Sequence, residues 1–495
     1  MFKKQLIIIF LCLFLNSYAQ TEFITIWKPN VSGSVDNAIA YGGTGTSYNI
    51  TWEEVGYPQH AGAINAVTSM SSNPLVISFG TSLNPNPVQA TYKVKASNGN
   101  GLFYGFRANV DYIEPNQEIL EVSQWGATSW LQQFTEGFVN CPNFNVTAVD
   151  TPDLSQITDL SMMFYNCPAL VGNSSFSNWN ISNVTNMNGM FMGATLFNQN
   201  IGNWNTAHVT NFDSMFNSAT SFNQNISAWN MSSAVNLTGM FKDAVTFNQP
   251  LNSWNTSNAT TFRYVFANAT SFNQPLNNWN TGKAIDFEHM FENAVSFNQP
   301  IGNWDVSKVS YFAGFNMFNG AALFDQDISN WNIKLQNFTW NSIGFGFKNS
   351  GLSCINYNKF LIALNNNTTW PISTITSGSI DATGLIYSTP QAIVARAQLI
   401  NKGFNIIGDN YNPSCNLATT EVPKAVKTVT YPNPTTGLIT VESTVNEKVY
   451  LYDSAGRIIK NMFLNKGKNL LDLAGIPSGH YVLKGNTVFT NIIKK

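Results

Sequence analysis

The chain of 495 residues is long enough for about three domains. Charged residues make up only 11 % of it, against roughly 25 % in an ordinary soluble protein. The net charge is −2, so no field exists that would attract nucleic acid or an anionic membrane, and neither is an expected partner. Aromatic residues make up 13 % and recur periodically, which excludes an intrinsically disordered chain.

Residues 1–19 are typical of a secretory signal peptide. Lys3 and Lys4 precede an apolar run at 6–15, which is too short for a permanent membrane anchor. Small residues ending at Ala19 resemble a cleavage site. No later stretch reaches the length of a membrane span. We therefore expect a secreted protein, extracellular or on the outer cell surface, with no transmembrane segment.

Residues 20–118 predict a separate β domain. Short runs rich in β-forming residues, at 22–27, 48–52, 75–79 and 91–95, are separated by Gly, Pro, Ser and Asn. Several short strands with turn signals between them predict a small β-sandwich.

The central part of the chain repeats one unit of 25 residues. Tryptophan marks each unit, at Trp179, Trp204, Trp229, Trp254, Trp279, Trp304 and, after a longer unit, Trp331. A Phe followed by Asn-Gln or Asp-Gln precedes most of these tryptophans, and an Ile or Leu lies between them. A fixed period of this length is typical of a solenoid, whose units bury their apolar faces on one another. We expect the solenoid at 119–338, with an atypical N-terminal cap at 119–160.

The unit also predicts its own local structure. At 209–219, apolar residues recur every three and four positions, which predicts a short helical or 3₁₀ turn. The spacing at 222–226 predicts a short strand, and equivalent strands of successive coils would pair in parallel. The expected fold class is therefore mainly β, or α+β.

Beyond the repeats, the sequence predicts a cap, a linker and a last domain. Apolar residues at helical spacing at 357–364 and 390–400 predict a closing cap over 339–411, which covers the apolar end of the stack. Residues 412–424 have the composition of a linker. Residues 425–495 predict a compact β domain.

Four cysteines follow the signal peptide. Cys354 and Cys415 bracket the cap, and we predict that they pair, because an exported chain meets oxidising conditions. Cys141 and Cys167 lie in matching contexts one unit apart. The two could form a disulfide between adjacent coils, but the favoured interpretation is that they are two small, buried, unpaired residues. No CxxC or HxxxH spacing occurs, so we expect no metal site and no cofactor.

The unit Met-Phe-x-x-Ala-x-x-Phe-Asn-Gln-x-Ile-x-x-Trp-Asn resembles the BspA-like leucine-rich repeat surface proteins, over about 119–409. The end of the chain resembles the type A sorting domain of the type IX (Por) secretion system of Bacteroidetes. That likeness rests on Tyr431-Pro-Asn-Pro-Thr-Thr-Gly437, Tyr452-Asp-Ser-Ala-Gly-Arg457, Ile-Pro-Ser-Gly at 476–479 and the basic end Lys494-Lys495. Residues 20–118 resemble immunoglobulin-like modules found beside such repeats.

These resemblances imply a leucine-rich-repeat-like β/α solenoid with 25-residue coils, flanked by an N-terminal β-sandwich and a C-terminal β-sandwich sorting domain. They also imply a cell-surface scaffold for adhesion, or for binding proteins of the matrix, exported by the type IX machinery. The sorting domain at 425–495 would be removed on export.

Two classes of function stay open, and a structural component of the cell coat is a third. One is a scaffold that binds an extracellular protein, and the other is a surface protein that binds glycans through exposed aromatic side chains. The sequence has no paired-carboxylate motif and no nucleophile motif, so we expect no enzyme. The repeated Asn-Gln pairs could hydrogen-bond sugars, but amides stacked on parallel coils bond one another more readily.

The two classes differ in whether the tryptophans are buried. The chain turns after each Trp, and burying one indole is worth about 5 kcal/mol. We therefore predict a buried ladder, formed by Trp204, Trp229, Trp254, Trp279 and Trp304. The ligand surface would then consist of the polar positions beside the ladder, such as Asn252, Ser253, Asn277 and Asn278.

Overall fold

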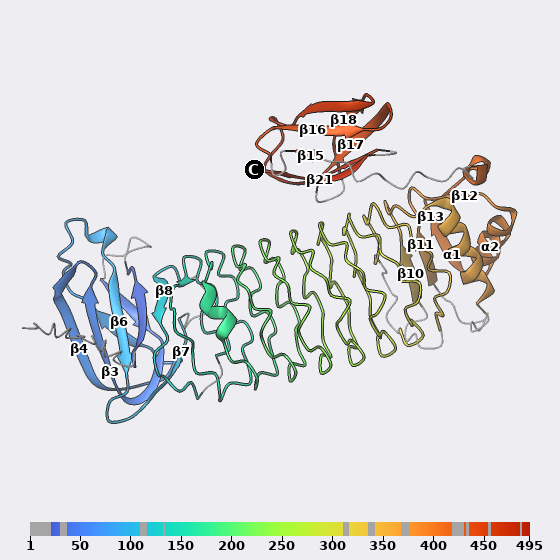
Figure 1. Ribbon diagram of the computed structural model, residues 1–495. Helices are drawn as coiled ribbons and strands as arrows, with labels where there is room; N and C mark the ends of the chain where they lie inside the picture. The colour runs from blue at the N-terminus through green and yellow to red at the C-terminus, as the bar shows by residue number, and fades with distance from the viewer. Residues whose placement is uncertain are drawn as a thin grey trace, which may run out of the picture.

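The structure is a computed structural model that describes residues 21–29, 37–108, 116–131, 134–309, 316–334, 342–367, 377–417, 430–431, 435–453, 457–485 and 488–495. The fold is mainly β, and the repeats form a row of successive coils that begins at an N-terminal sheet and ends at a pair of helices (Figure 1). The expected signal peptide and most of the expected linker lie outside the described residues.

The N-terminal part is built from two sheets that share a core. The larger sheet contains β1 (Phe23–Trp27), β3 (Gly43–Glu54), β4 (Tyr57–Ser69), β6 (Tyr92–Ser97), β7 (Phe103–Phe106), β8 (Ile119–Gln124) and β9 (Asn145–Val146), and the smaller one β2 (Ala38–Tyr41) and β5 (Leu75–Ser78). A 3₁₀ helix, η1 (Pro87–Gln89), precedes β6. Alternate side chains of β1 and β6 are buried. Phe79, just after β5, stacks on Tyr92 of β6 with 3.9 Å between ring centroids, so the two sheets are packed together.

The N-terminal sheet continues directly into the first coil. Strand β8 pairs antiparallel with β1 and parallel with β9. One hydrophobic core accordingly extends from Phe23 to Phe404. The sheet crosses the boundary that we expected at residue 118, because β8 has a backbone partner on each side.

Backbone hydrogen bonds hold each coil to the next. Parallel single-residue bridges link Asp159, Asn186, Asn211, Asn236, Thr261 and Asp286 in succession. Beside these bridges, the Ser214 and Phe216 N–H groups donate to carbonyls of the next coil at 2.8 and 2.9 Å. The intervening Met215 N–H donates to a carbonyl three residues earlier, at 3.2 Å. Successive N–H groups therefore donate alternately to carbonyls of the next coil and to carbonyls of their own coil.

This pattern corrects the local structure expected within the unit. Ser214 and Ser218 have φ angles of 56° and 61°, in the left-handed region. Two left-handed residues four apart interrupt a helix, so 209–219 is a series of turns. No strand is assigned at 222–226, since the coils pair at the bridge positions instead. Between residues 134 and 309 the structure contains a 3₁₀ helix, η2 (Ser174–Asn178), and no α-helix.

Columns of identical side chains fill the interior of the coils. The Phe216 ring lies 5.8 Å from those of Phe191 and Phe241, its equivalents in the neighbouring coils, measured between centroids. Within its own coil it stacks on Phe222 at 3.9 Å. Each coil thus buries its apolar face mainly on its neighbours, which explains why the period is so regular.

Two helices close the far end of this core. Parallel strands β10 (Ser342–Gly346), β11 (Ser377–Asp381) and β13 (Phe404–Ile407), with the pair β12 (Ile386–Tyr387) and β14 (Asn410–Tyr411), lie beside α1 (Cys354–Asn366), α2 (Pro390–Asn401) and the 3₁₀ helix η4 (Pro413–Leu417). The helices lie where helical spacing predicts them, after N-caps at Ser353 and Thr389. Phe360 of α1 packs edge-on against Phe347, the last ring of its column, at 5.0 Å.

The C-terminal domain is a sandwich of two antiparallel sheets with its own core. One sheet contains β15 (Thr430–Tyr431), β16 (Leu438–Ser443) and β19 (Gly467–Asp472), and the other β17 (Glu447–Tyr452), β18 (Ile458–Leu464), β20 (Gly479–Lys484) and β21 (Phe489–Lys494). Its buried residues, among them Val449, Leu451 and Leu483, form a cluster separate from the core of the coils.

Candidate functional site

The tryptophan ladder lies inside the coils. The exposed fraction is 2–3 % for each of Trp204, Trp229, Trp254, Trp279 and Trp304. Successive indoles stack with 6.1–6.5 Å between ring centroids. Each Nε1 donates to a carbonyl of the preceding coil at 2.7–3.1 Å, as Trp254 does to Ile226. These indoles offer no exposed face on which a sugar could stack.

The Asn-Gln pairs form a second ladder between coils. The Asn198 Oδ1 accepts from the Asn223 backbone N–H at 3.0 Å and from the Gln224 Nε2 at 2.9 Å. The same two bonds recur in the following coils, and Asp325 takes the Asn position at the end of the series. These amides hold neighbouring coils together.

The predicted ligand surface lies on a turn beside the ladder. Ser253 and Asn278 are exposed, while Asn252 and Asn277 are half-buried. Asn252 Oδ1 accepts from the Asn278 N–H at 2.9 Å, and the Ser253 hydroxyl donates to Ser227 of the preceding coil at 2.8 Å. The Asn277 side chain donates to that of Asn278 at 3.2 Å. All four side chains therefore take part in hydrogen bonds that hold the turn or bridge adjacent coils.

The four cysteines fall into two kinds. A disulfide joins Cys354 and Cys415, whose Cα atoms are 6.4 Å apart, and it ties α1 to η4. Cys141 and Cys167 are free and buried. The Cys167 thiol donates to the Phe138 carbonyl at 2.8 Å. Burial raises the pKa of Cys141 well above its usual range and that of Cys167 to about 12, so both remain unreactive thiols.

Sequence reasoning missed a group of charged and aromatic side chains on the bridged face of the coils. This face comprises 159–166 and the equivalent residues up to 286–293. We call it the ladder face after its series of backbone bridges, which is distinct from the tryptophan ladder. Its charged cluster consists of Lys242, Arg263, Tyr264, Asp286, Glu288, His289 and Glu292. Other coils carry small or uncharged residues at most of these positions, such as Thr238 and Gly239. The departure from the repeat is a signal that the sequence already contained.

Ion pairs and ring contacts connect the cluster across three coils. Arg263 Nη2 lies 2.8 Å from Glu288 Oε2, and His289 Nδ1 lies 2.8 Å from Glu292 Oε2. The Tyr264 and His289 rings stack, with centroids 4.6 Å apart and planes 9° apart. The Arg263 guanidinium is 5.1 Å from the Tyr264 ring centroid, and the Lys242 ammonium, from the preceding coil, is 5.5 Å from it.

The backbone of Tyr264 and His289 is unusual for aromatic residues. Both have a φ of 57°, in the left-handed region that disfavours side chains by about 1–2 kcal/mol. The equivalent residues of other coils are Met162, Gly189, Ser214 and Gly239, with φ angles of 55–59°. The coil geometry therefore imposes a left-handed residue at this position in every coil, which glycine adopts most easily, and the two rings are held in that conformation.

Burial and neighbouring charges shift the ionisation of the cluster. Burial raises the pKa of Asp286, although the Glu288 N–H and the positive charge of Arg263 oppose this. Burial lowers the pKa of Arg263, but its contact with Tyr264 and the charge of Glu288 more than compensate, and its pKa is raised overall. The Arg263 side chain is 42 % exposed, so its guanidinium reaches solvent while it pairs with Glu288.

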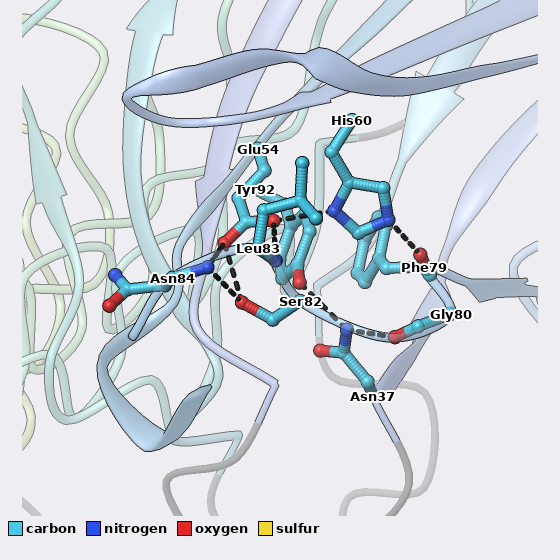
Figure 2. A network of polar contacts seen from close by, with 9 residues as sticks. All are labelled: Asn37, Glu54, His60, Phe79, Gly80, Ser82, Leu83, Asn84 and Tyr92. Carbon is cyan, nitrogen blue, oxygen red and sulfur yellow. Dashed lines mark hydrogen bonds and ion pairs between the residues drawn. The ribbon is translucent and has the colours of Figure 1, made fainter. Parts of the chain in front are cut away.

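A second polar network lies in the N-terminal sheets (Figure 2). The buried Glu54 carboxylate accepts from the Ser82 hydroxyl and from the Leu83 and Asn84 N–H groups, at 2.5, 2.9 and 3.0 Å. His60 Nδ1 is 2.5 Å from the same carboxylate, and its Nε2 is 2.7 Å from the Phe79 carbonyl. Burial raises the pKa of Glu54, but the hydrogen bonds outweigh it, and the net pKa is lowered. The network fixes the segment after β5 to β3 and β4.

Among the residues that the structure describes, no group of three His, Cys, Asp or Glu side chains is placed to hold a metal ion. Nor does any helix among them have the length and apolarity to cross a membrane.

Two family models match the chain. A model described as a Mycoplasma protein of unknown function, DUF285, matches residues 132–254 and 236–342, which are the coils. A model described as a secretion system C-terminal sorting domain matches residues 429–495. No curated protein and no solved structure matches the chain. The sorting domain implies export as cargo of the type IX secretion machinery, and placement on the cell surface or in the medium.

Proposed function

We propose that the exported protein is an extracellular binding scaffold, which holds a protein partner on the ladder face at the charged cluster. On this proposal the coils are a leucine-rich-repeat-like solenoid of the BspA type, from a member of the Bacteroidetes, and the partner is a host or matrix protein bound in adhesion. The observation that carries the proposal is the cluster itself, seven residues on one face of a chain with only 11 % charged residues.

The composition of the cluster favours a protein partner. Lys242 and Arg263 oppose Asp286, Glu288 and Glu292, so the cluster carries both signs of charge. A polyanion such as nucleic acid binds surfaces of predominantly positive charge. A patch that combines an aromatic ring, an arginine and charges of both signs has the makeup of residues that dominate protein interfaces.

The backbone of the cluster supports a role beyond folding. Stacking of Tyr264 on His289 is worth about 0.5–1.5 kcal/mol, which does not repay two left-handed aromatic residues at about 1–2 kcal/mol each. Residues held in unfavourable backbone conformations gather at functional sites. A binding role for the two rings accounts for large aromatic side chains at a left-handed position that other coils fill with Met162, Gly189, Ser214 or Gly239.

Glycan binding is the second candidate, and a coat component the third. Stacking on sugars needs exposed aromatic faces, and the five indoles of the ladder are buried. A glycan would instead meet the turn at Ser253 and Asn278, both of which are exposed. We propose no catalytic activity. In the network of Figure 2 the Ser82 hydroxyl donates to the Glu54 carboxylate, whereas the serine of a catalytic triad donates to the histidine.

Immobilised fibronectin, laminin and collagen, probed beside a glycan array, test the proposal. The decisive variant is Tyr264→Gly, which supplies the residue that the coil geometry favours and so separates binding from folding. Ser214→Gly makes the same exchange two coils away, outside the cluster. Arg263→Glu reverses a charge within the cluster, and Lys359→Glu reverses one on α1.

We expect Tyr264→Gly and Arg263→Glu each to weaken binding at least tenfold, while the two control variants bind like the parent chain. Removing one central aromatic or arginine contact typically costs about 2 kcal/mol, or more than tenfold in affinity. Binding to the glycan array alone, lost on Ser253→Ala and Asn278→Ala, would overturn the proposal in favour of the second candidate.

A further inference from the structure

The C-terminal domain rests against one flank of the coils. Figure 1 shows it, in orange and red, beside the row of coils at the end nearer α1. Lys484 at the end of β20 donates from Nζ to the Ala322 carbonyl at 2.8 Å. The Ser296 hydroxyl donates to Asn491 Oδ1 of β21 at 3.4 Å. Both contacts join segments more than 150 residues apart in sequence.

The repeat supplies an internal control for this contact. Residues two and three before the Asn-Gln pair lie on the flank in every coil. In two uncovered coils, Leu196 exposes 52 % of its surface and Val245 is half-buried. At the equivalent positions beside the C-terminal domain, Val295 and Ser296 expose 1 % and 2 %. The coils are otherwise alike, so the domain is what covers these positions.

The chemistry of the domain's contacting strands fits the flank. Lys484 is half-buried, and burial lowers its pKa, while the charge of Asp325 on the coils opposes that shift. His480, on the same strand, also has a pKa lowered by burial. An ammonium that is taken out of water needs a hydrogen-bond acceptor in its place. The Ala322 carbonyl provides one.

Beside these contacts, a cavity of about 750 Å³ lies between the domain and the coils. Its lining includes Glu292 and Lys348 from the coils and Tyr452 and Arg457 from the domain. Glu292 also belongs to the charged cluster. The domain therefore stands next to the ladder face.

We propose that the flank formed by Thr270, Val295, Ser296 and Ala322 is a docking surface for the chain's own sorting domain, which limits access to the charged cluster while it remains attached. The docking follows from the two hydrogen bonds between the domain and the coils and from the burial of Val295 and Ser296. Its effect on the cluster rests on the proposed function.

Paired cysteines in the full chain test the docking. Ser296→Cys with Asn491→Cys places two thiols across the contact. Ser221→Cys with Asn491→Cys is the matched control, because Ser221 occupies the same repeat position three coils away. After mild oxidation, a non-reducing peptide map should show the first disulfide at least tenfold more abundant than the second. Equal yields would overturn the docking.

Deleting residues 425–495 tests the consequence, since the domain has a core of its own. Hydrogen exchange around Val295 and Ser296 should then rise to the rate seen around Val245 and Thr246. Binding to the fibronectin, laminin or collagen that the full chain recognises should strengthen at least threefold. If the first disulfide forms selectively but the deletion leaves binding unchanged, the docking is supported and the limit on access to the charged cluster is overturned. Binding of neither form to any of the three would instead overturn the proposed function.

Discussion

Replacing Trp254 by alanine removes one rung of the buried ladder. This indole exposes 2 % of its surface, lies 6.5 and 6.1 Å from the rings of Trp229 and Trp279, and donates to the Ile226 carbonyl at 3.1 Å. Truncating a buried aromatic side chain costs about 3–5 kcal/mol. The Ile226 carbonyl loses the indole donor but keeps the Trp229 N–H at 3.1 Å, and losing this one hydrogen bond adds about 1 kcal/mol. We therefore expect the free energy of unfolding to fall by roughly 4–6 kcal/mol.

Two further variants separate the contributions. Trp254→Phe retains an aromatic ring but loses the N–H donor, and we expect it to cost about 1–3 kcal/mol. Leu196→Ala removes a side chain that is 52 % exposed, and it should cost less than about 1 kcal/mol.

Urea unfolding followed by far-UV circular dichroism measures all three changes, and acrylamide quenching of the parent protein measures the accessibility of the indoles. The m-value should stay constant while the midpoint shifts. A loss below 1 kcal/mol for Trp254→Ala, or strong quenching in the folded protein, would refute the buried ladder as the main source of stability.

Three other changes have defined outcomes. Because the pKa of Glu54 is lowered, the stabilisation from its carboxylate is present above pH 4.5 and is lost as the pH falls below that value. Glu54→Gln should therefore lower the free energy of unfolding by about 1–3 kcal/mol at pH 7. In a plot of urea midpoint against pH, the variant should show a flatter acid limb than the parent. Ser214→Gly should raise the free energy of unfolding by about 0.5–1 kcal/mol in the same urea assay, because the residue is left-handed and Gly189 occupies the equivalent place. Reducing the Cys354–Cys415 bond, which closes a loop of 61 residues, should lower the melting temperature by an amount equivalent to about 4 kcal/mol in calorimetry.

The period and the composition of the repeat predict a great deal of this structure. A 25-residue unit fixes which side chains meet in neighbouring coils, so a stack of aromatic columns follows from sequence alone. The helices of the closing cap also follow, because α1 and α2 have helical spacing and good N-caps. These features depend on patterns between residues that are close in sequence, or on the same pattern repeated at a fixed period.

The conformation within the coil did not follow from the pattern. Apolar spacing at 209–219 is that of a helix, but it cannot reveal that Ser214 and Ser218 take left-handed angles. Their conformation is imposed by hydrogen bonds to the next coil, which are contacts between residues far apart in the chain. The shared strand β8 escaped prediction for the same reason, since both of its partners are distant in sequence.

The repeat pattern does not reveal the charged cluster, because that pattern consists of the residues that the coils share. Functional side chains on a repeat scaffold occupy positions where the units differ. Tyr264 and His289 stand where other coils carry Met162, Gly189, Ser214 or Gly239, and this difference is visible in the sequence. What is not visible is that the two rings stack, and that Arg263 and Glu288 pair beside them.

The central claim is that the ladder face binds a protein through the charged cluster. The most direct measurement is the equilibrium binding of the parent chain and of Tyr264→Gly to whichever of fibronectin, laminin or collagen the parent recognises, with the unfolding free energy of both chains measured alongside. The account predicts that the variant is at least as stable as the parent and binds at least tenfold more weakly. Equal affinity in a folded Tyr264→Gly variant would contradict it.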